Sequence, residues 1–434
     1  MTVTQQMHHP DLNLLMDILP EESAVSDTGE LSIGGVPVGE LARQYGTPAY
    51  IMDETGLRRQ IRRFVKGLKS RRPNSEVLFA SKSLPCVAMY AIAQAEGLSV
   101  DVAGGGELMM ALTAGVSPGN IYLHGNAKSD QEIQMALAAG IRAVIVDNFN
   151  DLDRLEAMAS KEQNVLLRMI PGITPATHAS QVTGGNDSKF GLPPADITRA
   201  IERIAKHPLL HFEGIHVHIG SQVLETEPFA RAVQSVAEFG TFDTYDVGGG
   251  LGVKYTYDEI APSVEDYLDT LTEAAARLLP AEAKLIIEPG RSLVARAGIT
   301  LYSVNTVKTT GKTFVAINGG MADNIDIALT GQRYEAVMAT KIGAEPTLVA
   351  DVVGRQCESG DLMCADVPLA DPQVGDLVAM AATGAYAYTL ANNYNGACKP
   401  PVIFCANGSS TLAVARETYE DLLRTQQPAL QRRW

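Results

Sequence analysis

The chain lacks an excess of basic residues. Its 434 residues include 35 lysines and arginines against 50 aspartates and glutamates, which gives a formal net charge of −15. Because nucleic acids and anionic membranes are bound by basic faces, this balance argues against both as partners. It does not exclude an anionic substrate, since a few arginines can set the potential inside a cleft.

Long apolar runs and targeting signals are also missing. No apolar run reaches the roughly 18 residues that a membrane helix needs. The first residues, MTVTQQMHHPDLNLLMDILP, do not place a basic segment before an apolar one, so no signal peptide is predicted. We expect a poorly ordered leader and a cytoplasmic location.

Cysteine patterns typical of metal sites are absent as well. The five cysteines form no CxxC pair and are Cys86, Cys357, Cys364, Cys398 and Cys405. Two pairs share a spacing of seven residues, but without nearby histidines this spacing argues only weakly for zinc. Free thiols in a reducing compartment and no bound metal are therefore expected.

The middle of the chain alternates short, β-branched apolar runs with amphipathic segments. Near-continuous apolar runs with helices between them are typical of buried parallel strands. Eight such units predict a closed (β/α)8 barrel, with an open doubly wound sheet as the structural alternative. The predicted strands are 77–81, 99–103, 121–125, 143–147, 165–169, 214–219, 244–247 and 284–288. The predicted helices are 87–96, 106–114, 131–139, 151–160, 195–206, 228–239 and 264–279.

The pattern changes from about Gly298 onward. Segments such as TLYSVNTVKT and EPTLVADVVG alternate in hydrophobicity between glycine-rich turns and contain little helix, so a second, all-β domain of the sandwich or barrel type is predicted. A hairpin and a helix before the barrel could join it. We therefore assign residues 1–45 to a leader and joining segment, 46–297 to the barrel and 298–434 to the β domain.

Charged residues and glycines gather at the carboxyl ends of the predicted strands, where a (β/α)8 barrel builds its active site. In chain order they are Lys82, Asp101, the GGGE of 104–107, His124, Asp147, Arg168, the HVHIGS of 216–221, Gly248–Gly250 and the EPGR of 288–291.

A lysine and a glycine turn stand out in this set. Lys82 follows an apolar strand, where a desolvated amine suits imine formation; the alternative is an ion pair with Asp101 or Glu107. Gly248, Gly249 and Gly250 would let backbone N–H groups approach a phosphate, with the Ser221 hydroxyl beside them. Such a turn is also common without any ligand.

Two further side chains complete a recognisable chemistry. His218 could stack on a flat ring, although His216 points the same way by the period of a strand. Glu288 beside a pyridine nitrogen would keep that nitrogen protonated, and the protonated ring accepts electrons when CO2 leaves. Arg291 offers a planar fork for a carboxylate, unless EPGR is only a salt-bridged turn. Together these residues predict pyridoxal 5′-phosphate (PLP) as cofactor.

At this point the chain resembles the fold-type III PLP decarboxylases, and within them the diaminopimelate decarboxylases. The resemblance runs from about Gly46 to Gly396. It is carried by FASKS around Lys82, SVDVAGGGEL, YLHGNAKS, DSKFGL, HVHIGSQ, DVGGGLG, IIEPGRSLVARAG, CESGDL and GAYAYTLANNYNG.

The resemblance implies roles for single residues and a homodimer with shared active sites acting on an amino acid. It makes Lys82 the cofactor lysine, His218 the stacking residue and Glu288 the partner of the ring nitrogen. The residues implied at the phosphate are Ser221, Gly248, Gly249, Gly250 and Tyr386, and Tyr386 is also expected to contact the substrate. Cys357 would protonate the substrate carbon and Glu358 would hold the far ammonium, both reaching into the partner's site; Asp101 is a further cofactor contact.

One motif departs from the family pattern. Where these enzymes usually read RPALY, with Arg and Tyr on the distal carboxylate, this chain has Asp326 and Thr330. Losing a bidentate arginine costs on the order of 1.5–3 kcal/mol. Arg291 and Arg333 remain as candidates for this carboxylate.

Several functions therefore stay open. The leading one is conversion of meso-2,6-diaminopimelate to L-lysine and CO2. The alternative keeps the mechanism but takes an ornithine-like, lysine-like or conjugated substrate. A racemase is disfavoured by Glu288, and a PLP carrier without activity is disfavoured by the β domain.

Overall fold

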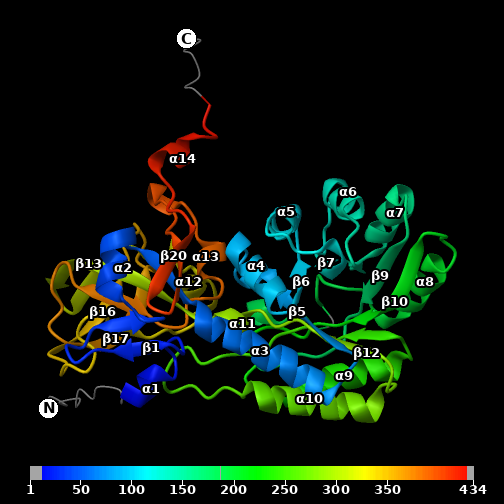
Figure 1. The fold of residues 1–434 in the computed structure, drawn as a ribbon, viewed down its shortest axis with the longest axis horizontal. Helices are drawn as coiled ribbons and strands as arrows, with labels where there is room; N and C mark the ends of the chain where they lie inside the picture. Colours follow the sequence, from blue (N-terminus) through cyan, green and yellow to red (C-terminus); the bar gives the residue numbers. More distant parts are fainter. Residues whose placement is uncertain (1–11, 186, 428–434) are drawn as a thin grey trace. The chain divides into compact units, whose positions relative to one another are not determined.

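The computed structural model describes residues 12–185 and 187–427 (Figure 1). It divides into two compact units. The barrel unit comprises 58–253 and 260–294, and the β unit comprises the chain up to 57, 254–259 and the chain from 295 onward. This division places 46–57, 254–259 and 295–297 in the β unit, whereas we predicted them in the barrel. Most of the predicted leader, 1–11, lies outside the described residues.

Eight parallel strands close into a barrel, which confirms the predicted fold class and excludes the open sheet. Each strand pairs with the next in chain order, and the last pairs with the first. All eight overlap the predicted runs. They are β5 (Ser75–Ala80), β6 (Ser99–Val102), β7 (Ile121–Leu123), β8 (Ala143–Val146), β9 (Gln163–Arg168), β10 (Leu210–His216), β11 (Thr244–Asp246) and β12 (Lys284–Ile287).

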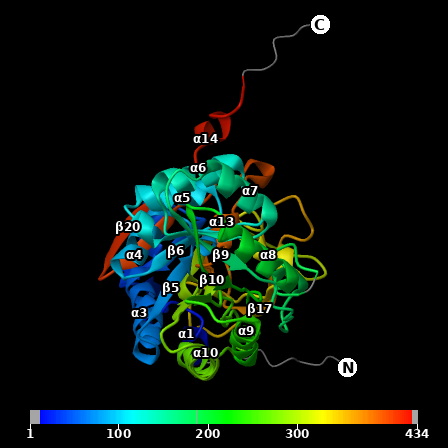
Figure 2. The same cartoon turned by 90° about the vertical axis from the view of Figure 1, so that its right-hand side faces the viewer.

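Helices surround these strands (Figure 2). Seven match the predicted segments: α4 (Val87–Ala95), α5 (Gly105–Thr113), α6 (Asp130–Ala139), α7 (Phe149–Met158), α8 (Pro194–Ile204), α9 (Glu227–Phe239) and α10 (Val264–Leu278). The short α11 (Arg291–Val294) follows β12, and α3 (Glu54–Arg71) precedes β5. The 3-10 turns of this unit are η1 (Ser81–Ser83), η2 (Pro118–Asn120) and η3 (Ala179–Gln181).

Burial on both faces explains the apolar composition of the barrel strands. All four residues of β8, the sequence AVIV, are buried, as expected for a parallel strand covered on both sides. One hydrophobic cluster joins side chains from five strands: Leu78, Tyr122, Ala143, Ile145, Leu166 and Ile286. This packed core fixes the positions of the barrel strands, and therefore of their carboxyl ends.

The β unit contains a nine-stranded sheet. β4 pairs antiparallel with β13 and parallel with β19, so a strand that precedes the barrel in sequence lies within this sheet. The strands are β4 (Ala49–Asp53), β13 (Gly298–Thr309), β14 (Thr313–Ile317), β15 (Ala336–Met338), β16 (Leu348–Val353), β17 (Leu362–Leu369), β18 (Leu377–Met380), β19 (Val402–Ala406) and β20 (Ser409–Val414).

The remaining elements of the β unit are short. The expected hairpin and helix form before the barrel. The elements there are α1 (Leu12–Met16), β1 (Ser23–Val25), β2 (Leu31–Ile33), β3 (Val36–Pro37) and α2 (Val38–Tyr45). Those that follow the barrel are α12 (Asp326–Thr330), α13 (Ala387–Leu390), η4 (Tyr394–Gly396) and α14 (Tyr419–Leu423).

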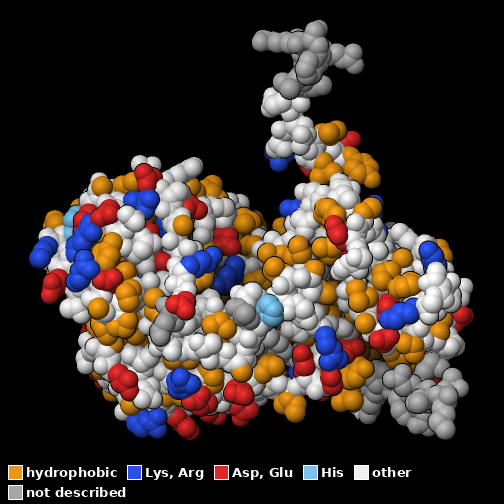
Figure 3. All heavy atoms as spheres, turned by 180° about the vertical axis from the view of Figure 1, so that it is seen from behind, with side chains coloured by type: hydrophobic (Ala, Val, Ile, Leu, Met, Phe, Trp, Pro, Cys, Tyr) orange, Lys and Arg blue, Asp and Glu red, His pale blue; other side chains and the backbone are white. Residues whose placement is uncertain are grey.

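Among the described residues, no helix combines the length and the apolar character needed to cross a membrane. On the face drawn in Figure 3, acidic, basic and hydrophobic side chains are interspersed.

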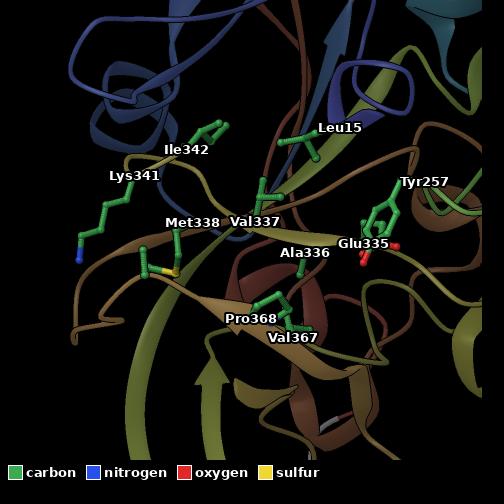
Figure 4. Close-up of a pocket in the computed structure, with 11 residues that line it drawn as sticks. Leu15, Tyr257, Glu335, Ala336, Val337, Met338, Lys341, Ile342, Val367 and Pro368 are labelled. Carbon is green, nitrogen blue, oxygen red and sulfur yellow. The ribbon is translucent and has the colours of Figure 1, made fainter. Parts of the chain in front are cut away.

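A small apolar pocket in the β unit contains one half-buried carboxyl group (Figure 4). Val337 and Met338 of β15 line it together with Val367, and the Glu335 carboxyl lies by the Tyr257 ring. Burial raises the pKa of Glu335 from 4.5 to about 7, although Arg333 opposes this shift. The folded protein therefore holds a proton on Glu335 more tightly than the unfolded chain does.

Replacing Glu335 by Gln should stabilise the protein only at higher pH. With the folded pKa raised, the stabilisation due to Glu335 is complete below pH 4.5 and is lost as the pH rises toward 7. Glu335→Gln keeps the neutral form, so its Tm should exceed wild type by about 2 °C at pH 8 and equal it near pH 5. Thermal scans at both values test this, with the exposed Glu345→Gln as control; a pH-independent difference would contradict it.

Candidate active site

The structure places the predicted site residues in both units. The barrel unit holds Lys82, Asp101, His218, Ser221, Gly248, Gly249, Gly250, Glu288 and Arg291, all at or just beyond the carboxyl ends of barrel strands. The β unit holds Arg333, Cys357, Glu358 and Tyr386.

Glu288, just beyond β12, lies between two histidines. His124 Nε2 is 2.9 Å from Glu288 Oε1, and His216 Nε2 is 3.2 Å from Oε2. Asp246, at the end of β11, completes a buried group whose ligand-type atoms all lie within 4.8 Å of one another. This donor set also matches those of divalent metals. Three neighbouring strand ends and the loop after β7 thus converge on one carboxylate.

The two imidazoles determine the charge of this group. Burial alone would raise the pKa of Glu288, but His124 and His216 outweigh it and hold the pKa well below its usual range. Burial lowers the pKa of His124 to about 4 and also lowers that of His216, while Glu288 opposes both shifts. Burial, with the charge of Glu288, raises the pKa of Asp246 well above its usual value. Glu288 therefore carries the negative charge of the group.

Lys82 lies in the turn η1 directly after β5. Its side chain is exposed, so the prediction that the Lys82 amine is desolvated is wrong for this structure. Asp101 beside it is buried, and burial together with Glu288 raises the pKa of Asp101, while the charge of Lys82 opposes this. Glu107 accepts a hydrogen bond from the Ala103 N–H at 2.6 Å. The Lys82 amine is thus accessible at the mouth of the barrel.

His218 and the glycine turn are joined by a hydrogen bond. The Gly249 N–H donates to His218 Nδ1 at 3.1 Å, and the Gly248 N–H donates to Asp246 Oδ1 at 2.9 Å. Burial, then Lys82, lowers the pKa of His218 well below 6.5, so its ring is neutral. A Cβ on Gly248 would lie 2.6 Å from the Val217 carbonyl oxygen. Of the three N–H groups predicted at the phosphate, those of Gly248 and Gly249 donate within the barrel unit in this structure, and that of Gly250 has no acceptor among the described residues.

Arg291 and Ser221 lie together in the barrel unit. Arg291 Nε donates to Ser221 Oγ at 3.2 Å, and the Arg291 side chain is buried. A predicted substrate residue thus contacts a predicted phosphate residue. A second guanidinium, that of Arg168, lies 4.5 Å from the Phe190 ring centroid and 3.9 Å from Asp147 Oδ1.

Cys357 and Glu358 lie in an exposed loop of the β unit. The Cys357 N–H donates to Asn395 Oδ1 at 2.8 Å, and the Tyr394 hydroxyl donates to Glu358 Oε1 at 2.7 Å. Both residues are therefore held by η4 and its neighbourhood. Tyr386 is half-buried at the start of α13, where its φ is 62°.

Asp326 is buried within the β unit and is surrounded by donors. The Tyr334 hydroxyl donates to Asp326 Oδ2 at 3.1 Å, and Thr330 Oγ1 donates to Oδ1 at 3.1 Å. Arg333, by contrast, is exposed and pairs with Asp258 at 3.2 Å. The two residues that replace the family's Arg and Tyr therefore form a hydrogen-bonded set with Tyr334.

Three residues around Glu288 were missed as site residues from the sequence. His124 and His216 were noted at strand ends but received no role, and Asp246 was not noted. The available signal was their position at the ends of strands β7, β10 and β11, since such ends face a common mouth in a closed barrel.

A closed (β/α)8 barrel with a lysine, a glycine turn and an ionised glutamate at its strand ends, in a chain that also has a separate β unit, defines the class of barrel-type PLP enzymes. The model of the pyridoxal-dependent decarboxylases, pyridoxal binding domain, matches residues 56–295. The chain belongs to this family and is a PLP-dependent carboxy-lyase.

Relatives with known names cover almost the whole chain. Diaminopimelate decarboxylase of Actinosynnema pretiosum subsp. auranticum is 42% identical over 92% of this chain and 93% of its own. The diaminopimelate decarboxylase of Bacillus subtilis is 39% identical over 92% of this chain and 96% of its own. The crystal structure of diaminopimelate decarboxylase from M. jannaschi matches with a TM-score of 0.88 and 30% sequence identity. The match covers 94% of this chain and 98% of that chain. The lysine/ornithine decarboxylase of Vibrio vulnificus, complexed with cadaverine, has a TM-score of 0.74 and 25% identity over 85% and 97%.

The residues present fit PLP. Glu288 Oε1 is buried, and its geometry to His124 leaves it without a well-oriented donor among the described residues, as a partner for a protonated ring nitrogen requires. The Gly250 N–H and the Ser221 hydroxyl can donate hydrogen bonds to a phosphate. The accessible Lys82 amine can bind the aldehyde carbon. PLP, when bound, supplies the ring that accepts the electron pair released as the carboxylate leaves.

Proposed function

We propose that this enzyme converts meso-2,6-diaminopimelate to L-lysine and CO2. The observation that carries the proposal is the similarity to diaminopimelate decarboxylases at 36–42% identity over more than nine tenths of the chain. The reaction breaks one Cα–carboxylate bond and replaces it with a Cα–H bond. The chain must therefore hold the carboxylate that leaves, the distal end and the proton donor.

The barrel unit would hold the cofactor. Lys82 binds it covalently through Nζ, neutral His218 stacks on its ring, and ionised Glu288 keeps the ring nitrogen protonated. Ser221 and Gly250 bind the phosphate, with Tyr386 assigned there by the family resemblance. Because Glu288 is buried, its charge acts on the ring with little screening by water.

Arg333 would bind the distal carboxylate in place of the missing arginine. Its pair with Asp258 is exposed on both sides, with 69% and 54% of the side chains accessible, so exchanging Asp258 for a substrate carboxylate costs less than about 1 kcal/mol. Arg291 remains the other candidate, although its Nε is engaged by Ser221.

The enzyme would act as a homodimer in the cytoplasm. In this arrangement Cys357 of one protomer protonates the substrate carbon at its partner's site, and Glu358 holds the far ammonium there. The exposed position of both residues, and their anchoring by Asn395 and Tyr394, support this arrangement.

A second candidate substrate is an ornithine-like, lysine-like or conjugated amino acid. The observation that favours it is the buried set of Asp326, Thr330 and Tyr334, in which hydrogen bonds replace the usual arginine and tyrosine. Mass-detected turnover of meso-diaminopimelate, ornithine and lysine by the PLP-loaded protein separates the two. Lysine formed from diaminopimelate supports the first; turnover only of the others supports the second.

Arg333→Gln is expected to raise KM for diaminopimelate about 10- to 100-fold, because it removes a charge-assisted contact of about 1.5–3 kcal/mol. The kcat should change little, since the distal carboxylate is bound equally before and during the reaction. Steady-state kinetics test this, with the exposed Arg424→Gln as control. An unchanged KM would assign the carboxylate to Arg291 instead.

A further inference from the structure

A polar cavity of about 400 Å³ lies within the β unit, apart from the residues assigned above. One liquid water molecule occupies about 30 Å³, so the cavity has room for a small organic molecule. The charged and thiol side chains on its wall come from four segments of the chain. They are Asp323, Arg355, Cys398, Arg416, Glu417 and Glu420, with Gln356 among the polar ones.

The charge of Asp323 acts on both guanidinium groups of the wall, Arg416 and Arg355, without a direct contact. Half-buried Arg416 donates through Nη2 to the carbonyl oxygens of Tyr45 at 3.1 Å and Pro48 at 2.7 Å. Among the described residues no carboxylate forms an ion pair with Arg416 or with exposed Arg355. A guanidinium that is partly removed from water is stabilised by an anion, so this side of the cavity favours a carboxylate.

The same wall also carries two buried hydrogen-bond acceptors, the side chains of Asp323 and Gln356. Asp323 is 3% exposed and accepts one backbone hydrogen bond, from the Gly320 N–H at 2.9 Å. Gln356 is 7% exposed, and its Oε1 has no hydrogen-bond partner. Glu417, in contrast, already accepts from Asn393 and from the Lys399 N–H. Among the described residues, Gln356 Oε1 thus lacks the donor that a buried acceptor requires, and the Asp323 carboxylate has one backbone donor.

We propose that this cavity binds a free α-amino acid as a zwitterion. Its carboxylate would lie on Arg416 and Arg355, and its ammonium would donate to Asp323 and Gln356 Oε1. A zwitterion supplies both missing partners at once, whereas a simple anion or a simple amine supplies one. The site lies in the β unit and is distinct from the cofactor site in the barrel unit.

Occupancy would also hold the loop of Cys357. Arg355 and Gln356 directly precede Cys357, whose N–H is held by Asn395, and Gly396 beside Asn395 lines the cavity. A bound amino acid would therefore restrain this loop through its contacts with Arg355 and Gln356. Only this effect on the loop rests on the proposed function; binding in the cavity does not.

Alkylation of Cys398 provides the test, because this half-buried thiol lines the cavity. Holoenzyme is treated with iodoacetamide at pH 8.5, and the modified peptides are quantified by mass. L-lysine and L-norleucine, which are both α-zwitterions, should slow Cys398 labelling about tenfold at ten times their Kd. Cadaverine, without a carboxylate, and 6-aminohexanoate, without an α-amine, should not.

Labelling of exposed Cys357 reports separately on binding at the active site. Protection of Cys357 alone would mean that lysine binds only at the active site, which overturns the cavity proposal and leaves the proposed function intact. Protection by all four compounds, or by none at 50 mM, would overturn it as well.

Two variants separate binding from folding. Arg355→Gln, which removes an exposed side chain, should abolish the protection of Cys398 while Tm stays within about 1 °C of wild type. Arg416→Gln should abolish it too, but could lower Tm through the lost contacts to Tyr45 and Pro48. Arg424→Gln, outside the cavity, is the matched control and should keep full protection; protection retained in Arg355→Gln and Arg416→Gln would refute the assignment.

Discussion

Replacing Lys82 by Ala is expected to lower kcat/KM on the order of 10⁴-fold, because it removes the amine that we propose binds the cofactor covalently. Lys82 stands at the end of β5, and its amine is exposed at the mouth of the barrel. Without it, PLP would be held by the phosphate and ring contacts alone. Covalent retention should therefore be lost, while part of the affinity remains.

Borohydride reduction of the holoenzyme followed by peptide mass analysis checks this result. Wild type should carry the reduced cofactor on the peptide that contains Lys82, and Lys82→Ala should carry none. Lys206→Ala removes an exposed lysine at the end of the same unit's α8 and should behave as wild type. A reduced adduct on another lysine in Lys82→Ala would reassign the role.

The barrel was readable from the sequence because parallel strands buried on both faces leave continuous apolar runs. One large element was nevertheless missed. Leu57, Ile61, Phe64 and Leu68 recur at helical spacing and are fully buried in α3, among many arginines. This apolar spacing is visible in the sequence, but the segment was not predicted as a helix because most of its other residues are charged or polar.

The site was less readable, because its contacts depend on where each strand ends. From the period of a strand, His216 and His218 were expected on one side and could not be distinguished. β10 ends at His216, so His216 contacts Glu288 while His218 contacts the Gly249 N–H. Likewise, the sequence showed an acid at Asp326 but not its hydrogen bonds from Tyr334 and Thr330, which depend on folding of α12.

Glu288→Gln should lower kcat about 10²- to 10³-fold with PLP still bound, an effect of about 3–4 kcal/mol. The amide preserves the shape of the side chain and its place between His124 and His216 but removes the charge. The ring nitrogen then loses the partner that keeps it protonated, so the ring accepts electrons less well as CO2 leaves. Because the change affects the transition state more than binding, KM should change little.

The same substitution distinguishes charge from position. Glu288→Asp keeps the charge and should recover part of the lost kcat, whereas Glu227→Gln, at an exposed position of α9, should have no effect. Absorbance of the bound cofactor should shift in Glu288→Gln even without substrate, since the protonation of the ring changes. An unchanged spectrum and kcat would show that another acid protonates the ring, and Asp246, within the same group of four, would be the residue to replace next.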